Sequence, residues 1–232
     1  MHLHIIIPVV NEAENLRRLL PYLREELNGR GSITVACGGS TDDTAAVMAA
    51  NPDVRLLSCT RCGRAQQMNE AAGDSQDPTD VFYFVHADTR PPEGFVDDII
   101  EAIAAGYPVG CYRFRFDTWH PLLKINAFFT RFNWLPGRGG DQSLYVTREV
   151  FEQLEGFRDM KIMEDYDIIQ RVWAADIPFR IIPRAITVSA RKYRANNWLR
   201  VQLANWKVFR MYKAGAAEDD MIALYRSRLR PW

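Results

Sequence analysis

A run of five apolar residues, 81–85, leads directly into a polar cluster that ends at two consecutive prolines. Apolar residues in such a run are typical of a strand covered on both faces, as in a parallel sheet between two layers of helices. His86 and Asp88 follow this strand within the polar cluster. Because ligands bind at the carboxyl ends of the strands in open α/β sheets, the sequence predicts a ligand site here.

Strand-like and helix-like patterns alternate through the first half of the chain, with short connections between them. This alternation predicts an α/β fold, a Rossmann-like, mostly parallel sheet with helices on both faces. The expected strands are 2–8, 32–36, 54–58, 81–85, 111–116, 142–147, 179–182 and 186–189. A long helix is expected at 197–212. We therefore expect one α/β domain over 1–190 and a C-terminal helical extension, 191–232, packed on it.

Composition excludes several classes of protein. The chain has 232 residues, of which 47% are hydrophobic, and this is enough to build a full core. Lys plus Arg equal Asp plus Glu at 29 each, so the charge gives no support for binding to nucleic acid. No stretch approaches roughly 18 consecutive apolar residues, and the first residues resemble a strand rather than a signal peptide. We therefore expect a cytoplasmic protein without a membrane-spanning helix.

Cys59 and Cys62 form a lone CxxC pair. Two incidental thiols are the leading interpretation, because a structural zinc site needs four ligands and no second CxxC or CxxH accompanies the pair. A redox pair is the alternative.

Five short motifs follow one another along the expected elements. They are Ile7–Glu12, Gly38–Thr44, His86–Asp88, Gly156–Phe157 and Met163–Asp167. In this order they resemble the inverting family 2 glycosyltransferases of the GT-A fold, over residues 3–190. The third motif stands where that family has its DxD-type motif. Two more segments, 63–69 and 140–142, are similar to a bacterial subgroup, the radical-SAM/selenodomain-associated transferases.

The resemblance implies transfer of a sugar from a nucleotide-diphosphate sugar to an acceptor hydroxyl, by single displacement with inversion. A bound Mg²⁺ or Mn²⁺ would offset the charge that builds on the leaving diphosphate, and Asp88 is the expected metal ligand. His86 stands where the family more often has aspartate, so it would contact ribose, reach the metal through water, or shape the loop. The alternative for Asp88 is an N-cap of the next helix.

Asp165 is the general base that the resemblance implies, because a carboxylate near the acceptor hydroxyl can remove its proton. Glu164 beside it would raise the pKa of Asp165, while the helix N-terminus would favour the ionised form. The alternative is that Glu164, Asp165 and Asp167 are acids of the kind that any helix start favours. The expected contacts to sugar or acceptor are Gly140, Asp141, Gln142 and Glu164.

The donor nucleotide is expected over the ends of the first two strands. Its expected contacts are Pro8, Val9, Asn11, Glu12, Cys37, Gly38, Arg64, His86 and Ala87. Gly38 would allow close approach of the backbone, whereas Cys37 departs from the family, which usually has aspartate there. A thiol is a weak hydrogen-bond partner, so the donor affinity and the identity of the base stay open. For Arg64, a surface arginine without a ligand is the alternative.

The segment 191–213 contains seven Lys or Arg residues and no Asp or Glu, interleaved with aromatic residues. Its first part, with Arg191 and Arg194, would close over the diphosphate as a lid. The rest is typical of a basic amphipathic helix in peripheral contact with the inner face of a membrane, which would suit a lipid-linked acceptor. Packing of its aromatic side chains on the α/β domain is the alternative.

Three other classes of protein are less consistent with the sequence. A nucleotidyltransferase-like enzyme usually has a glycine-rich phosphate loop after its first strand, where this chain has Pro8–Glu12. A degenerate nucleotide-sugar-binding protein without transfer activity would account for Cys37, but not for the intact Asp165. A dinucleotide-dependent dehydrogenase would need a GxGxxG motif after the first strand, and the chain has none there.

Overall fold

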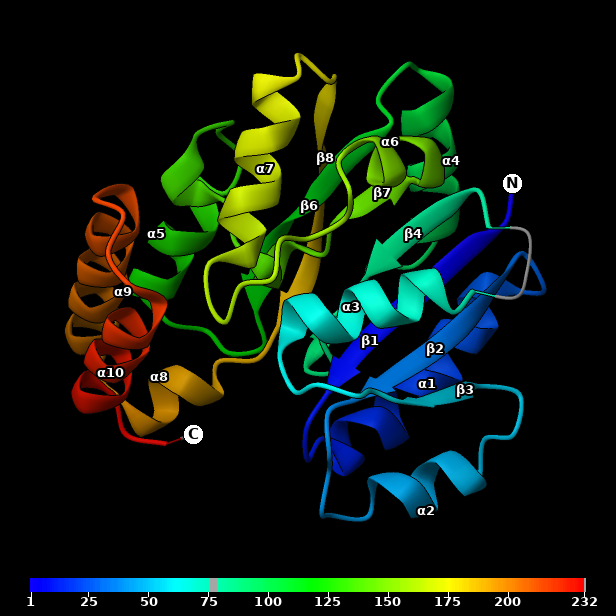
Figure 1. Ribbon diagram of the computed structural model, residues 1–232, viewed down its shortest axis with the longest axis horizontal. Helices are drawn as coiled ribbons and strands as arrows, with labels where there is room; N and C mark the ends of the chain where they lie inside the picture. Colours follow the sequence, from blue (N-terminus) through cyan, green and yellow to red (C-terminus); the bar gives the residue numbers. More distant parts are fainter. Residues whose placement is uncertain (76–78, 232) are drawn as a thin grey trace.

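The structure is a computed structural model that describes residues 1–75 and 79–231. Within these residues one sheet of eight strands has the order β3-β2-β1-β4-β7-β6-β8-β5 (Figure 1). The strands are β1 (Leu3–Val9), β2 (Gly31–Cys37), β3 (Arg55–Ser58), β4 (Val81–Phe84), β5 (Thr89–Arg90), β6 (Val109–Phe116), β7 (Tyr145–Thr147) and β8 (Phe179–Val188). The first four strands pair in parallel, as do β6 and β8, while β7 is antiparallel to β4 and β6. The expected α/β fold with a mostly parallel sheet is confirmed.

Helices cover both faces of this sheet. The α-helices are α1 (Ala13–Leu27), α2 (Thr44–Ala49), α3 (Arg64–Gly73), α4 (Phe95–Ala104), α5 (Pro121–Phe129), α6 (Arg148–Gln153), α7 (Glu164–Ala174), α8 (Arg191–Ala195), α9 (Trp198–Lys213) and α10 (Glu218–Arg228). Two short 3₁₀ helices are η1 (Leu135–Gly137) and η2 (Gly140–Gln142). No helix in the described part of the chain has the length and apolar character needed to span a membrane.

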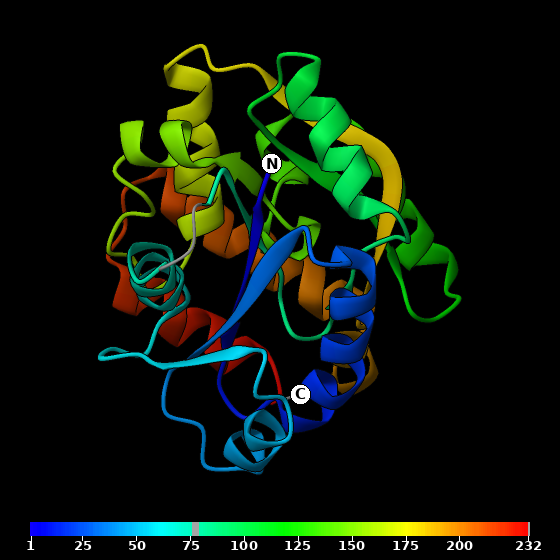
Figure 2. The same cartoon turned by 90° about the vertical axis from the view of Figure 1, so that its right-hand side faces the viewer.

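The apolar run of β1 is buried because the strand serves two cores. Ile5 and Ile7 pack in one cluster with residues of α1 and α4, and Ile6 packs in another with residues of α3 and α7. Successive side chains of a strand point to opposite faces, so a strand with helices on both sides needs apolar residues throughout. Figure 2 shows α1 on one side of β1 and α3 on the other. Each buried isoleucine contributes about 1.5–3 kcal/mol.

β8 is one strand of ten residues, where two short strands were expected. Its pairing with β6 shifts register between Tyr112 and Arg113, whose partners are Ile182 and Ala185. The two residues between these partners, one of them Pro183, therefore leave the ladder as a bulge. Proline has no N–H to donate, and a bulge lets the strand continue beyond it.

The loops after β1 and β2 are joined by hydrogen bonds. Asn11 has a φ of 57°, a left-handed conformation that asparagine tolerates. Its Oδ1 accepts from the backbone N–H groups of Thr41 and Asp42 at 2.7 and 3.2 Å. In return, Asp42 Oδ2 accepts from the backbone N–H of Ala13, the first residue of α1, at 3.0 Å. These bonds fix the edge of the sheet where the parallel strands end.

The C-terminal helices pack against the start of α7. Met163, Val208 and Met221 are buried in a small apolar cluster that joins the segment before α7 to α9 and α10. Figure 1 shows α9 and α10 beside each other at the left of the molecule. The sheet ends at Val188, and the described elements after it are helices. The division into a domain of 1–190 and an extension of 191–232 stays a prediction.

Candidate active site

A cavity of about 590 Å³ opens at the carboxyl edge of the sheet, beside the ends of β1 and β4. The residues on its sheet side are Pro8, Val9, Glu12, Arg64, Gln67, His86, Ala87 and Asp88. Those on its far side, from α5, the segment after it, α8 and α9, include Asn126, Phe129, Trp134, Tyr193, Gln202 and Asn205. The cavity thus has one side rich in charged groups and one rich in aromatic and amide groups. Its volume is in the range of small-molecule sites.

The structure brings most of the expected donor and metal contacts into this cavity, and Asp141 and Arg191 line it as well. Asn11 and Arg194 lie outside it, in a neighbouring cavity beside α1. Three further expected contacts that line neither of these two cavities are Cys37, Gly38 and Glu164. Gly140 lies in η2, directly before Asp141.

Asp165, the expected base, lines a second and smaller pocket of about 30 Å³, together with Gln142. His86, Arg138 and Gly139 line both this pocket and the main cavity. The shared residues place Asp165 at the boundary of the main cavity rather than in its open part.

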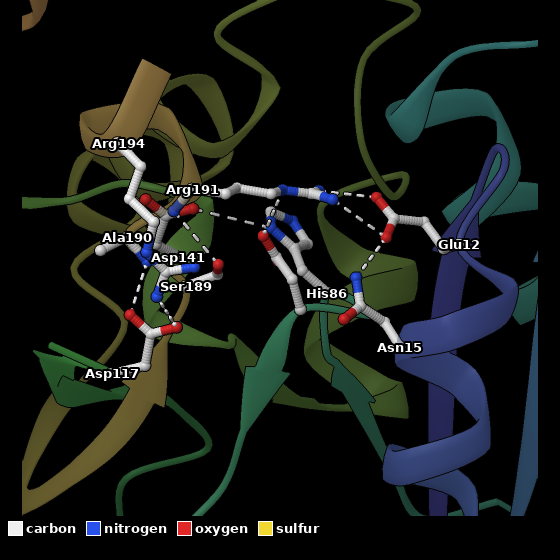
Figure 3. A network of polar contacts seen from close by, with 10 residues as sticks. Glu12, Asn15, His86, Asp117, Asp141, Ser189, Ala190, Arg191 and Arg194 are labelled. Carbon is white, nitrogen blue, oxygen red and sulfur yellow. Dashed lines mark hydrogen bonds and ion pairs between the residues drawn. The ribbon is translucent and has the colours of Figure 1, made fainter. Parts of the chain in front are cut away.

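Arg191 bridges two of the expected site carboxylates. Its Nη1 and Nη2 donate to Oε2 and Oε1 of Glu12 at 3.1 and 2.6 Å, and its Nε lies 3.1 Å from Asp88 Oδ2. Figure 3 shows the guanidinium reaching across to Glu12 beside α1. A planar guanidinium suits such paired contacts with carboxylates. Arg191 and Glu12 are 179 residues apart, so the bridge joins distant parts of the chain over the charged side of the cavity.

Arg194, the second expected lid residue, is held away from the cavity. Its Nη2 donates to Asp117 Oδ2 at 2.8 Å, and Asp117 Oδ1 accepts from the backbone N–H of Ala190 at 2.9 Å (Figure 3). Of the two arginines, only Arg191 lines the main cavity in this structure.

Asp88 lies in the turn between β4 and β5, and its side chain is 22% exposed. Burial raises the pKa of Asp88 above its ordinary value, while the charges of Arg191 and His86 act in the opposite direction. The N-cap residue of α4 is Gly94, so the alternative of a capping role for Asp88 is wrong. The carboxylate is therefore held at the cavity by Arg191 rather than by the helix that follows.

His86 and Asp141 form an ion pair, with Nδ1 3.8 Å from Oδ1 (Figure 3). Burial by itself would lower the pKa of His86, but its contact with Asp141 and the charge of Asp165 raise it above the ordinary value. Loss of water would raise the pKa of Asp141, but His86 and Lys192 lower it well below the ordinary value. The imidazole is thereby biased towards its charged form and tied to η2.

Asp88 is the side chain best placed to hold a divalent cation, because His86 is biased towards its charged form, and a protonated imidazole has no lone pair to bind a metal. Among residues 1–75 and 79–231, no three His, Cys, Asp or Glu side chains come together as a metal site. Mg²⁺ is commonly bound by one or two carboxylates together with substrate phosphates and water. Asp88 fits that arrangement once Arg191 gives up its contact with Oδ2. The residues present therefore fit a cation that arrives with a diphosphate, and they do not make a site for a cation by itself.

The first turn of α7 carries three acidic side chains, and they differ in their partners. Glu164 is 1% exposed, and its Oε1 lies 2.8 Å from Arg64 Nε. Asp167 pairs with two arginines at 3.1 and 2.7 Å. In the described part of the chain, the side chain of Asp165 makes no ion pair, and it faces the small pocket. This difference favours a chemical role for Asp165 over the interpretation that all three only stabilise the helix start.

Glu164 is a structural residue as much as a candidate contact. Burial, and then the charge of Asp165, raise the pKa of Glu164 above its ordinary value, and the charge of Arg64 opposes both. Because its carboxylate is bound to Arg64 and is almost fully buried, it is not accessible to a ligand in this structure.

Local contacts account for both Gly38, which packs against Gln67, and Cys37, whose thiol contacts Ser40. The Nε2 of Gln67 donates to the carbonyl oxygens of Val9 and Ala36 at 3.0 and 2.6 Å. A Cβ at Gly38 would lie 2.9 Å from this side chain, so glycine is needed there without any nucleotide. Burial would raise the pKa of the Cys37 thiol, but hydrogen bonds within the turn that follows it lower the pKa below its ordinary value. No local sequence pattern indicates this role of Gln67.

Arg138 is a site residue that sequence reasoning missed. It is only 2% exposed, and its guanidinium donates to Cys111 Sγ at 3.0 Å, to the carbonyl of Phe132 at 2.8 Å and to that of Thr130. Neighbouring glycines give it the local pattern of an exposed loop. Those glycines were also the only local signal of an unusual backbone.

The fold and the sequence were compared with known proteins. The family model for glycosyl transferase family 2 matches residues 4–157, and no curated protein matches the sequence. The chain is similar to the solved structure of the mannosyltransferase PcManGT from Pyrobaculum calidifontis in complex with GDP-Man and Mn²⁺, with a TM-score of 0.68 and 19% identity. This similarity covers 91% of the chain but 63% of the mannosyltransferase, so the chain spans less than two thirds of that protein.

Two further structures are similar. S. aureus TarS 1–349 in complex with UDP-GlcNAc has a TM-score of 0.64 and 13% identity, over 98% of this chain and 71% of that chain. The catalytic domain of Drosophila beta1,4galactosyltransferase 7 has a TM-score of 0.52 and 15% identity, over 78% and 64%. These similarities confirm the GT-A fold. Because the matching family model spans well over half of its residues, the chain belongs to glycosyl transferase family 2.

Proposed function

We propose that this chain transfers a sugar from a nucleotide-diphosphate sugar to an acceptor hydroxyl, by a single displacement that inverts the anomeric carbon. The observation that carries the proposal is that Asp88 and Asp165 line adjoining spaces which share His86 as a wall. One carboxylate lies at the expected diphosphate and the other at the boundary where an acceptor would approach. The similar structures bind GDP-Man with Mn²⁺ and UDP-GlcNAc, which supports a nucleotide-sugar donor.

At the donor end, the nucleotide lies over Pro8 and Val9 with its diphosphate towards Asp88 and Arg191. Mg²⁺ or Mn²⁺ held by Asp88 and the diphosphate supplies positive charge that stabilises the leaving group. Arg191 exchanges its contact with Asp88 for diphosphate oxygens, which a guanidinium binds in a forked geometry. Its two hydrogen bonds to Glu12 keep it within reach during this exchange. Arg191 thus acts as the lid residue, and Arg194 holds α8 in place through Asp117.

At the acceptor end, Asp165 removes the proton of the attacking hydroxyl. Its carboxylate is suited to this because it makes no ion pair within the described residues, in contrast to Glu164 and Asp167. The hydroxyl attacks the anomeric carbon opposite the leaving diphosphate, and one such displacement inverts the centre. Asp141, tied to His86, lies on the acceptor side of the cavity and is a candidate contact for sugar hydroxyls.

Two other functions are less favoured than sugar transfer. Membership of glycosyl transferase family 2 disfavours a nucleotidyltransferase-like enzyme. A degenerate binding protein would bind the donor without turning it over, which only an activity measurement tests. The bacterial subgroup suggested by 63–69 and 140–142 stays a prediction, because Gln67 and Asn69 in the first of these segments make internal hydrogen bonds that folding by itself explains.

The first test is a panel of nucleoside diphosphates and nucleotide sugars, read as the shift in melting temperature with Mn²⁺, with Mg²⁺ and with chelator. A ligand at one hundred times its Kd stabilises by about 2.7 kcal/mol, which is a shift of roughly 5–10 °C for a chain of this size. We expect the shift with metal and little of it in chelator, and we expect Asp88→Asn to abolish the difference. Equal shifts in metal and chelator contradict the metal role, and no shift with any nucleotide contradicts the donor class.

A further inference from the structure

Large exposed apolar side chains gather on one part of the molecule. In the described residues thirteen large hydrophobic side chains are exposed, and nine of them lie within 119–134 or 199–206. These nine, called the apolar rim below, are Trp119, Ile125, Phe128, Phe129, Phe132, Trp134, Leu199, Leu203 and Trp206. An exposed apolar surface of this extent marks an interaction site.

The two parts of the apolar rim belong to neighbouring walls of the main cavity. Phe129 lines the cavity from α5, and Gln202 lines it from α9. Asn126 joins these helices, because its Nδ2 donates to Tyr193 Oη at 3.2 Å and its Oδ1 accepts from Trp198 Nε1 at 3.3 Å. Figure 1 shows α5 and α9 close together at the left of the molecule. The rim therefore lies around the aromatic side of the cavity, away from Asp88.

The outer surface of α9 carries an apolar stripe. Leu199, Leu203 and Trp206 follow one another at spacings of four and three residues, which places them on one face of the helix. They are 60%, 49% and 53% exposed. Arg200 and Lys207 lie on the adjoining face and line a surface groove of about 450 Å³ between α9 and the end of α10. The stripe thus separates a side that lines the cavity from a cationic side.

The groove beside α9 has a positive lining without compensating acids. Its four charged residues are Arg200, Lys207, Arg228 and Arg230, and none of them makes an ion pair within residues 1–75 and 79–231. A cluster of cations without ion pairs favours the binding of a group of negative charges, such as the phosphate groups of anionic lipids. We call it the cationic groove.

The part of the apolar rim on and after α5 also combines apolar side chains with cations. No Asp or Glu occurs from 118 to 140. Lys124 Nζ lies 5.1 Å from the ring centre of Trp119, and the guanidinium of Arg131 lies 4.0 Å from that of Phe128. Aromatic rings that alternate with cations are typical of protein surfaces at the boundary between lipid head groups and acyl chains.

We propose that the apolar rim and the cationic groove bind an anionic lipid bilayer, with the rim at the boundary of head groups and acyl chains and lipid phosphates in the groove. A second copy of the chain is a poorer occupant, because a symmetric contact would bring the same unpaired cations together. The bilayer surface differs from the expected segment 191–213. Arg191 and Arg194 are paired within the protein, whereas the segment 119–134, outside 191–213, contributes six of the nine rim residues.

Together with the proposed function, on which this step rests, the surface identifies the class of acceptor. Phe129 and Trp134 belong both to the apolar rim and to the cavity wall. A lipid-linked acceptor can therefore keep its acyl chain in the bilayer while its polar head enters the cavity towards Asp165. An acceptor free in solution would gain nothing from an apolar rim at the cavity.

The test is sedimentation of the full chain with vesicles of phosphatidylcholine, with and without phosphatidylglycerol. We expect binding to the anionic vesicles, at least tenfold weaker binding to the neutral ones, and weakening by salt. Replacement of two groove cations, Arg200→Gln with Lys207→Gln, should lower the affinity about twentyfold, since each cation near such a surface contributes about fivefold. The pair Leu203→Glu and Trp206→Glu should abolish binding.

The control is Leu56→Glu, which adds one of the two charges of that pair at a leucine on β3 that is 40% exposed. It should bind vesicles as the unaltered protein does. Absence of vesicle binding, equal binding to neutral and anionic vesicles, or a dimer in solution that Leu203→Glu with Trp206→Glu makes monomeric would each overturn the proposal. The nucleotide-dependent melting shift is measured on the same samples. If it persists while vesicle binding fails, the inference about the bilayer is wrong and the proposed function is untouched.

Discussion

The two halves of the sheet contribute to the cavity in different ways. In the half formed by β1 to β4, the site residues lie directly at strand ends, and neighbouring loops are held by short hydrogen bonds such as those of Asn11 and Gln67. In the half formed by β6 to β8, most cavity side chains come from helices and 3₁₀ turns beyond the sheet, and Phe114 and Phe116 come from β6 itself. The expected donor side therefore depends mainly on strand geometry, and the expected acceptor side depends mainly on the packing of separate helices.

This difference predicts a division of labour that mutations can test. Changes in the first half should alter donor binding, and changes in the second half should alter transfer while donor binding persists. Arg191 is the exception, because it belongs to the second half by sequence and pairs with two carboxylates of the first.

The largest effect is expected for Asp165→Asn, which removes the proton acceptor and keeps the shape of the side chain. The rate of transfer should fall by about 10²–10⁴-fold, with donor affinity changed by less than about threefold. Transfer is measured in single turnover and donor affinity by calorimetry. Asp176→Asn, at an exposed aspartate just beyond the other end of α7, is the control and should leave both quantities unchanged. Normal turnover of Asp165→Asn would show that this residue is not the base.

A smaller effect is expected for Arg191→Gln, compared with Arg194→Gln. Loss of Arg191 leaves Glu12 and Asp88 without their cation, so unfolding should become easier by about 1 kcal/mol, a figure reduced for the partial exposure of the arginine. Nucleotide affinity should fall as well. The pair of Arg194 is more exposed, and its loss should change the unfolding free energy by less than about 0.5 kcal/mol. Equal effects in denaturant titrations would contradict a special role for Arg191.

The smallest effect is expected for Asp141→Asn, which should change the protonation of His86. Asp141→Asn should lower the pKa of His86 towards its ordinary value of 6.5, as followed by NMR of the imidazole. The raised pKa of His86 stabilises the fold below pH 6.5, and this contribution is lost as the pH rises through the folded-state pKa. The lowered pKa of Asp141 stabilises it above pH 3.8, and this is lost as the pH falls through its own folded-state value. The variant should therefore be less stable than the native protein above pH 3.8, and the difference should become smaller as the pH rises through the folded-state pKa of His86, because Lys192 still stabilises the Asp141 carboxylate there. A difference that does not become smaller in that range would argue against the pair.

Local sequence patterns were sufficient for the first half of the fold. The apolar runs of β1 and β4 reflect burial on both faces, and Asp88 could be placed at a strand end because parallel strands share one carboxyl edge. The same patterns failed at β8, where Pro183 suggested a break. The strand continues past Pro183 because it pairs with β6 and forms a bulge. Neither feature can be recognised from a few neighbouring residues of the sequence.

The rest of the site depends on contacts between distant residues. Nothing near Arg191 indicates that it binds Glu12, and nothing near Arg138 indicates that it is buried against Cys111. Charged side chains are usually exposed, so sequence reasoning does not place Arg138 in the interior, and it expects Arg191 to contact a diphosphate rather than Glu12. The partners of such groups are determined only when the helices after β6 have packed on the sheet.

The ion pair between the exposed Arg64 and the buried Glu164 has a consequence for how α3 and α7 stay aligned. Arg64 is the first residue of α3, on the donor side, and Glu164 is the first residue of α7, directly before Asp165. Sliding of one helix relative to the other would leave a buried carboxylate without its cation, which is strongly unfavourable. The two helix starts are thus fastened to each other before any substrate arrives. Residues of the aromatic wall can therefore change while the spacing between the starts of α3 and α7 is preserved.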